Sequence, residues 1–138
     1  MAFSDTGDGG ASEAPLPSET ILLVEDEPAV RALFAVALRQ AGYQVLEARN
    51  GTEALAVFAE AREEIRLLLT DIRMPYLGGT ELAAKLLKEK PELRLLYISG
   101  YPTRLELGPN SALLQKPFVR ADLLRAVRDM LDRPIVSA

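Results

Sequence analysis

The sequence predicts an α/β protein built on a doubly wound sheet of five parallel strands. The main observation is an alternation along the chain. Short, unbroken apolar runs, typical of strands buried on both faces, are followed by segments whose apolar residues repeat at helical spacing. Strands joined through helices pair in parallel, and right-handed crossovers place helices on both faces of the sheet. The second observation is size: 138 residues, 49% of them hydrophobic, suffice for one domain with its own core.

The first strand and helix show this alternation most clearly. Residues 21–24 form an unbroken apolar run, which predicts a buried strand. Pro28 suits the first position of a helix, and Gly42 is a typical C-terminal stop. Between them, apolar residues three or four positions apart predict one buried helix face: Val30, Leu33, Phe34, Ala37 and Leu38.

Four more strands and three more helices complete the pattern. Strands are predicted over residues 43–47, 65–69, 93–98 and 112–114. Helices are predicted over about residues 51–62, 80–90 and 120–131. Because ligands of such sheets bind outside the carboxyl ends of the strands, the residues that follow each strand are the candidates for function.

The ends of the chain differ in composition from the rest. Residues 1–19 are rich in Gly, Ser, Asp and Pro, which predicts a disordered leader or a linker. Residues 20–133 are expected to form the folded domain, and residues 134–138 a short tail. We expect a stand-alone regulator or a piece of a larger protein. The chain lacks a signal-peptide pattern and any apolar stretch of the ~20 residues that cross a bilayer, which predicts a cytoplasmic protein.

The composition excludes several kinds of chemistry. The chain has no cysteine and no histidine, which removes disulfides, thiolate sites, the usual zinc ligands and the Ser-His-Asp triad. A formal net charge of −4, without a basic run, argues against binding of nucleic acid. Any reaction must therefore use carboxylates, hydroxyls, amines and the backbone, and any metal should be a hard cation such as Mg²⁺.

Polar side chains follow four of the predicted strands. They are Glu25, Asp26 and Glu27 after the first strand, Asp71 after the third, Ser99 after the fourth and Lys116 after the fifth. Each of them alone is common in a turn, and Glu27 before a proline fits the start of a helix. Together, at one edge of the sheet, they suit a Mg²⁺ ion that holds a phosphoryl group, with the lysine balancing its charge.

Four linked segments of the chain carry a resemblance to a known family. These are residues 21–28, residues 70–75 with the following Gly78 and Gly79, residues 97–101, and residues 115–118. They resemble the receiver domains of two-component response regulators, over about residues 20–133. The resemblance implies a flavodoxin-like receiver fold, similar to the chemotaxis receivers, with strand order 2-1-3-4-5. The segments around Ser99 and Lys116 look most like receivers attached to hybrid histidine kinases.

The resemblance implies a metal site and a phosphoacceptor. Asp71 corresponds to the aspartate that receives the phosphoryl group. Asp26, Asp71 and the backbone carbonyl of Arg73 would bind Mg²⁺ directly, and Glu25 would contact the metal through water. Three carboxylates so close together repel one another, and a bound cation keeps Asp71 ionised as a nucleophile.

The resemblance also implies a conformational switch. Ser99 would be the hydroxyl that moves to meet the phosphoryl oxygen, and Lys116 would pair first with Asp71 and then with the phosphate. Members of the family usually have a cis peptide after this lysine, so we expect one between Lys116 and Pro117.

The implied partner is a sensor histidine kinase or a histidine phosphotransfer protein, which would supply the histidine that this chain lacks. The protein would catalyse its own phosphorylation rather than act as an enzyme on a separate substrate, and self-catalysed hydrolysis would reset it. No direct contact with nucleic acid or membrane is expected. The downstream protein is not indicated, and a homodimer stays open.

The sequence departs from the family pattern in three places. Glu25 stands where many receivers carry aspartate. Between Pro102 and Pro109 there is room for one or two helical turns, which predicts a shortened or irregular fourth helix. Leu113 occupies the position of a switch aromatic in many receivers. Tyr101 could replace it or be a partly buried loop residue.

The same residues bear on three other functions. A Mg²⁺-dependent aspartyl phosphohydrolase would need a second aspartate at the position of Arg73, where this chain offers no acid or base. A degenerate receiver that serves only as a protein-interaction module is disfavoured by the retention of Asp26, Asp71, Ser99 and Lys116. A flavodoxin-like nucleotide binder would need a phosphate-cradling loop in place of the acidic residues after the first strand.

Overall fold

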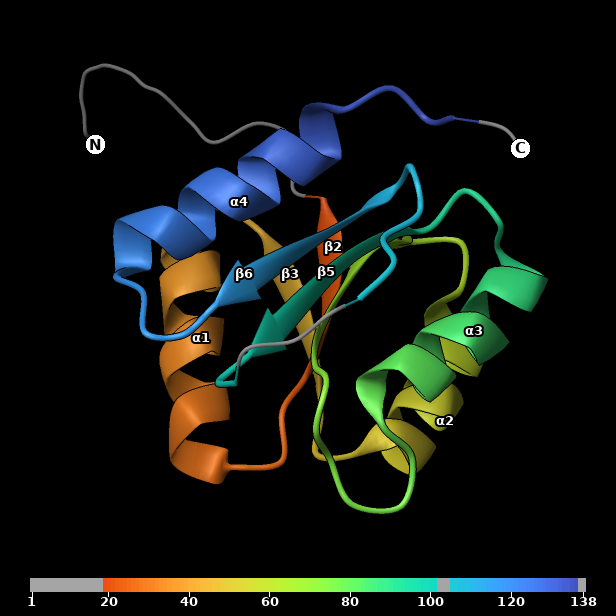
Figure 1. Cartoon of the computed structure of the whole chain (residues 1–138), viewed down its shortest axis with the longest axis horizontal. Coiled ribbons are helices and arrows are strands. Elements are labelled where there is room, and N and C mark those ends of the chain that lie inside the picture. The colour runs from red at the N-terminus through yellow and green to blue at the C-terminus, as the bar shows by residue number, and fades with distance from the viewer. Residues whose placement is uncertain (1–18, 102–104, 137–138) are drawn as a thin grey trace.

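The computed structural model describes residues 19–101 and 105–136, which form a five-stranded parallel sheet with helices on both faces (Figure 1). The strands are β2 (Thr20–Val24), β3 (Gln44–Ala48), β4 (Ile65–Asp71), β5 (Arg94–Ser99) and β6 (Ser111–Gln115). The helices are α1 (Pro28–Gln40), α2 (Gly51–Ala61), α3 (Gly79–Glu89) and α4 (Arg120–Asp132). The sheet order is β3-β2-β4-β5-β6, which confirms the predicted order 2-1-3-4-5.

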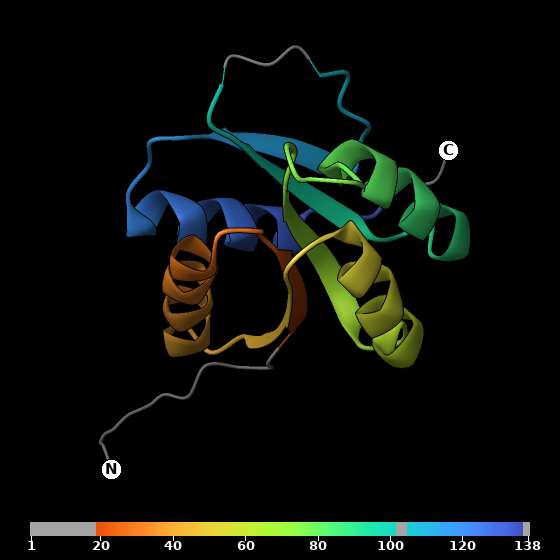
Figure 2. The ribbon, with the colours of Figure 1, turned by 90° about the horizontal axis from the view of Figure 1, so that it is seen from below.

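The strand β2, which pairs with β3 on one side and β4 on the other, contributes side chains to both halves of the core. Ile21 and Leu23 face the cluster formed with α1 and α4, whereas Leu22 and Val24 face the cluster formed with α2 and α3. All four side chains are at most 1% exposed, as expected for a parallel strand covered on both faces. Figure 2, seen from below, shows the two helix pairs on opposite sides of the sheet.

Local sequence signals explain where helices begin and end. Pro28 occupies the first turn of α1, as predicted, and Gly42 after this helix has a φ of 104°, a conformation that favours glycine. The side chain of Asn50 caps α2 by accepting a hydrogen bond of 2.8 Å from the Glu53 backbone N–H. These caps fix the directions in which the chain leaves the strand ends.

The strand bounds differ from the predicted ones by one or two residues. The main difference is β4, which was predicted to end at residue 69 but continues through Thr70 and Asp71. Both residues pair with β5, in register with Tyr97 and Ile98. Backbone pairing does not depend on an apolar side chain, so the hydrophobic pattern marked the end of the strand too early.

The segment between β5 and β6 contains no helix in its described part. Residues 105–108 have no regular structure and residues 109–110 form a turn, while residues 102–104 lie outside the described part of the chain. The described residues thus agree with the predicted irregular fourth helix. The predicted start of this segment at Pro102 lies outside the described residues. A depression of about 630 Å³ remains beside β5, lined by Leu95, Tyr97 and the loop before β6.

Both ends of the folded part are held by side chains. Glu19 accepts a 2.9 Å hydrogen bond from Arg128 of α4, and the Asn110 side chain bonds both the backbone N–H and the carbonyl of Val136. The predicted leader, apart from Glu19, lies outside the described residues.

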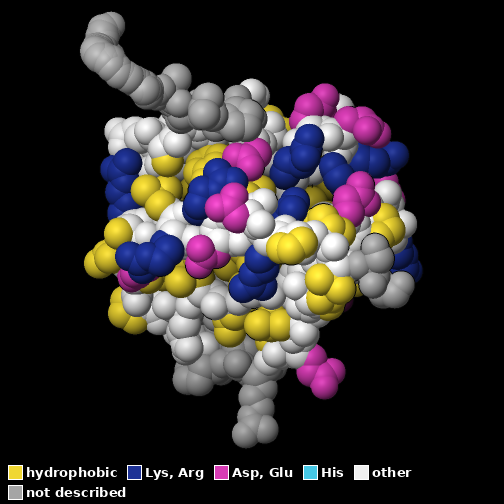
Figure 3. Space-filling view, turned by 90° about the horizontal axis from the view of Figure 1, so that it is seen from above, with side chains coloured by type: hydrophobic (Ala, Val, Ile, Leu, Met, Phe, Trp, Pro, Cys, Tyr) yellow, Lys and Arg dark blue, Asp and Glu magenta, His cyan; other side chains and the backbone are white. Residues whose placement is uncertain are grey.

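The face of the molecule in Figure 3 shows no basic tract among its described residues. On the face shown in Figure 3, Lys and Arg side chains are interspersed with Asp and Glu and with apolar groups. Within the described ranges, no helix is both long and apolar enough to cross a membrane.

Candidate functional site

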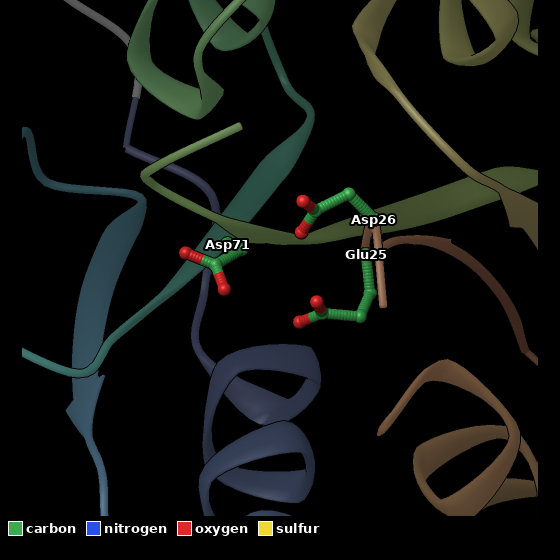
Figure 4. A group of neighbouring side chains, drawn as sticks. All are labelled: Glu25, Asp26 and Asp71. Carbon is green, nitrogen blue, oxygen red and sulfur yellow. The ribbon is translucent and has the colours of Figure 1, made fainter. Parts of the chain in front are cut away.

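Acidic residues from two neighbouring strands meet at the carboxyl edge of the sheet (Figure 4). Glu25 and Asp26 follow β2, and Asp71 is the last residue of β4. One carboxylate oxygen from each of the three residues lies within 4.8 Å of the others. The structure thus brings together the three carboxylates that the sequence predicted for the metal.

Lys116 reaches this cluster from the loop after β6. Its Nζ lies 3.4 Å from Asp71 Oδ2 and 3.9 Å from Glu25 Oε1. Its backbone N–H donates a 2.8 Å hydrogen bond to the Ser99 carbonyl, and the Lys116–Pro117 peptide is cis, as predicted. The cluster forms one wall of an open depression of about 480 Å³, through which a ligand can approach Asp71.

Glu25 is the most buried residue of the cluster, with its side chain 2% exposed. Its Oε2 accepts a 3.1 Å hydrogen bond from the Glu27 N–H, but its Oε1 has no hydrogen-bond partner in the described part of the chain. The pKa of Glu25 is raised to about 7, chiefly by burial and also by the charge of Asp71, while the Glu27 N–H and Lys116 act in the opposite direction.

This environment fits a hard cation. A buried carboxylate oxygen without a partner is costly, and a cation would restore an interaction to it. The donor set of three carboxylates contains only the oxygen ligands that Mg²⁺ prefers. The residues present therefore suit a magnesium ion.

The backbone around Asp71 fixes the direction of its side chain. Asp71 Oδ1 accepts a 3.0 Å hydrogen bond from the Arg73 N–H, and Oδ2 faces Lys116. The Thr70 hydroxyl donates a hydrogen bond of 2.9 Å to the Asp71 carbonyl. A Cβ atom at Gly79 would clash with the same carbonyl oxygen, so the start of α3 packs directly against the end of β4.

Ser99 lies at the end of β5 but is engaged with the following loop. Its buried hydroxyl donates a 2.8 Å hydrogen bond to the Tyr101 carbonyl and accepts one of 3.2 Å from the Tyr101 N–H. Tyr101 itself is 58% exposed, so it does not fill the role of an inward-facing aromatic in this structure. Leu113 is half-buried and packs against the α2–α3 cluster.

Two contributions to the site were not found from the sequence. The Arg31 guanidinium, from α1, donates a hydrogen bond of 2.8 Å to the Glu25 carbonyl. The Arg73 guanidinium lies 4.5 Å from the centre of the Tyr101 ring. The family resemblance implies a role for the backbone carbonyl of Arg73 but none for its guanidinium. Arg31 stands in no distinctive motif, and the motif that contains Arg73 does not indicate where its guanidinium lies, so only the spatial neighbourhood reveals these contacts.

Comparisons with known proteins agree with this arrangement. A family model described as the response regulator receiver domain matches residues 21–128. The sensor kinase CckA of Brucella abortus is 36% identical over 121 residues, which cover 84% of this chain and 13% of that kinase. The response regulator receiver protein CpdR of the same bacterium is 38% identical over 117 residues, which cover 80% of this chain and 95% of CpdR.

A solved structure shows the same fold. The response regulator TrrA from Thermotoga maritima, in complex with Mg²⁺ and BeF, superposes with a TM-score of 0.72 at 30% sequence identity, covering 81% of this chain and 98% of that one. The family model spans most of the folded chain, and the two relatives are at least 36% identical to it. This chain therefore belongs to the response regulator receiver domains of two-component signalling.

Proposed function

We propose that the protein accepts a phosphoryl group on Asp71 from a phosphohistidine of a partner protein, a histidine kinase or a histidine phosphotransfer protein. The observation that carries this proposal is the placement of Lys116 Nζ 3.4 Å from Asp71 Oδ2, beside two further carboxylates in an open depression. Asp71 is a nucleophile within reach of solvent, and the lysine supplies positive charge where phosphoryl oxygens gather.

Magnesium is the proposed cofactor. Asp26, Asp71 and the carbonyl of Arg73 would hold the ion, with Glu25 acting through water. When bound, Mg²⁺ neutralises charge on the carboxylates and on the transferring phosphoryl oxygens. The solved relative TrrA is described in complex with Mg²⁺ and BeF, which supports the same chemistry here.

The transfer breaks one bond and forms one. A carboxylate oxygen of Asp71 attacks the phosphorus in line, the P–O bond forms, and the P–N bond to the partner's imidazole breaks. The electron pair of that bond leaves with the imidazole nitrogen. The ammonium of Lys116 then pairs with the phosphoryl oxygens in place of the Asp71 carboxylate, and the Ser99 hydroxyl donates a hydrogen bond to one of these oxygens.

Hydrolysis would reverse the switch. Water attacks the phosphorus of the acyl phosphate, and Asp71 leaves as a carboxylate with release of inorganic phosphate. The protein therefore acts on its own aspartate as a signalling switch, not as an enzyme with a separate substrate. Phosphorylation would change the surface around Ser99, and a downstream protein would recognise that change.

The proposal is tested with acetyl phosphate as a small phosphodonor and Mg²⁺. We expect wild-type protein and Asp129→Asn to be labelled equally, since Asp129 is exposed on α4, and we expect no labelling of Asp71→Asn or in EDTA. Equal labelling of Asp71→Asn would remove this residue as the acceptor. Failure of wild type to label would favour a module that acts through protein interaction alone.

A further inference from the structure

We propose that the side chains of Arg73 and Tyr101 form a latch that holds the Ser99 hydroxyl away from the phosphoryl group until Asp71 is phosphorylated. This inference rests on the proposed function, because it concerns the change that follows phosphorylation. Arg73 and Tyr101 are positioning residues in this account, since they act through Ser99.

The latch joins two loops at the rim of the site. Arg73 follows β4 and Tyr101 follows β5, and the guanidinium of Arg73 stacks 4.5 Å from the ring centre of Tyr101. Both residues line the same depression as Asp71. In the described part of the chain the Arg73 guanidinium forms no ion pair, although four carboxylate side chains line that depression. Its cationic group is held on the ring instead.

Ser99 connects this stack to the proposed switch. The serine hydroxyl has one proton, and it donates that proton to the Tyr101 carbonyl at 2.8 Å. It cannot donate to a phosphoryl oxygen at the same time. Binding of the phosphoryl group by Ser99 therefore requires release of the Tyr101 carbonyl, and any contact that holds Tyr101 in place opposes that release.

Arg73 links the latch to the acceptor. Its backbone N–H donates a hydrogen bond of 3.0 Å to Asp71 Oδ1. One residue therefore contacts both the proposed phosphoacceptor and the Tyr101 ring. Tyr101 is 58% exposed, and an exposed cation–π contact shifts an equilibrium by about two- to fivefold. A bias of this size delays the switch without blocking it.

The test measures the affinity for beryllium fluoride, a phosphoryl analogue, at a fixed Mg²⁺ concentration. Tyr101→Leu removes the ring, and we expect it to bind beryllium fluoride about two- to fivefold more tightly than wild type. In an Arg73→Met background, which keeps the backbone carbonyl of residue 73, we expect Tyr101→Leu to leave the affinity for beryllium fluoride unchanged.

Two further variants separate the latch from a general structural role. Tyr101→Phe keeps the ring and should behave as wild type. Tyr76→Leu removes a tyrosine that is 95% exposed and does not line the depression, and it should also leave the affinity unchanged. Thermal unfolding without beryllium fluoride shows whether each variant folds. If Tyr101→Leu does not fold, the affinity of Arg73→Met alone for beryllium fluoride is compared with that of wild type in its place.

Each outcome decides the proposal. Unchanged or weaker affinity of Tyr101→Leu, or the same tightening in both backgrounds, would overturn the latch while leaving phosphorylation of Asp71 intact. If wild-type protein neither bound beryllium fluoride nor took label from acetyl phosphate, the proposed function would fail, and the latch with it.

Discussion

At the scale of single residues, the site depends on one lysine placed between two carboxylates. Lys116 Nζ is 3.4 Å from Asp71 and 3.9 Å from Glu25, with its side chain 29% exposed. In the proposed function, this position would neutralise repulsion between the carboxylates before phosphorylation and would leave the ammonium near the oxygens that arrive with the phosphoryl group.

We therefore expect Lys116→Met to slow phosphorylation by acetyl phosphate by roughly 100-fold, the cost typical of a lost charge-stabilising donor. The initial rate of labelling at saturating Mg²⁺ measures this loss. Lys85→Met, an exposed position on α3, is the matched control and should label at the wild-type rate. A wild-type rate for Lys116→Met would refute the role of this lysine.

Glu25 makes the stability of the metal-free protein depend on pH. Its pKa is raised from 4.5 to about 7 in the folded state, chiefly by burial. Between these two values the folded protein keeps a proton that the unfolded chain has lost. The free energy of unfolding contributed by this group therefore falls as pH rises from about 4.5 to about 7, and then levels off.

Glu25→Gln removes this titration. In EDTA we expect the stability of the variant relative to wild type to increase with pH between 5 and 7.5 (roughly the span of the two pKa values), measured by urea unfolding. Asp129→Asn should show no such trend, since Asp129 lies exposed on α4. A difference between Glu25→Gln and wild type that stays constant across this range would contradict the shifted pKa.

At the scale of the elements, the junction of β4 with α3 sets the position of Asp71. Gly79 begins α3 directly against the Asp71 carbonyl, and a Cβ atom there would clash with it. We expect Gly79→Ala to lower the free energy of unfolding by about 1–3 kcal/mol, the usual cost of overpacking.

Gly108 provides the comparison for this change. Among the described residues, a Cβ at Gly108 would meet only the Ser111 side chain, at 3.8 Å, which is ordinary van der Waals contact. We expect Gly108→Ala to change stability by less than about 0.5 kcal/mol, as at other open surface positions. Equal losses for the two variants in urea unfolding would show that the junction is not tightly packed.

The elements themselves could be predicted from the sequence to a large extent. Apolar runs such as residues 21–24 and helix signals such as Pro28 act locally, so strand order and most helix bounds followed from them with the family resemblance. The end of β4 did not, because Thr70 and Asp71 are held by pairing with β5, which no local pattern shows.

The residues of the candidate site could be predicted from the ends of the strands, but their contacts across loops could not. Strand ends converge in any parallel sheet, so Glu25, Asp26, Asp71 and Lys116 could be grouped before any coordinates were known. The contacts of Arg31 and of the Arg73 guanidinium depend on side-chain direction across loops. Those directions are fixed by tertiary packing, and no local pattern in the sequence indicates them.

At the scale of the whole molecule, the proposed metal binding would be linked to folding. Three carboxylates converge when the chain folds and are separated in the unfolded state, so the proposed cation would bind the folded form preferentially. We expect MgCl₂ to raise the midpoint of thermal unfolding, and EDTA to reverse the effect.

The Mg²⁺ effect has two controls. Asp26→Asn removes one of the proposed ligands and should lose most of the rise, whereas Asp129→Asn should keep it. NaCl at matched ionic strength accounts for screening. A rise of the same size in NaCl, or in Asp26→Asn, would argue against a specific site at this cluster.

The central claim is that the phosphoryl group is carried by Asp71, and the most direct measurement locates it chemically. After phosphorylation with acetyl phosphate and Mg²⁺, borohydride reduces an acyl phosphate to the alcohol, and peptide mass spectrometry then identifies the converted aspartate. The account predicts homoserine at position 71, absent when the donor is omitted. Conversion at Asp26, or at no aspartate in a protein that carries label, would contradict it.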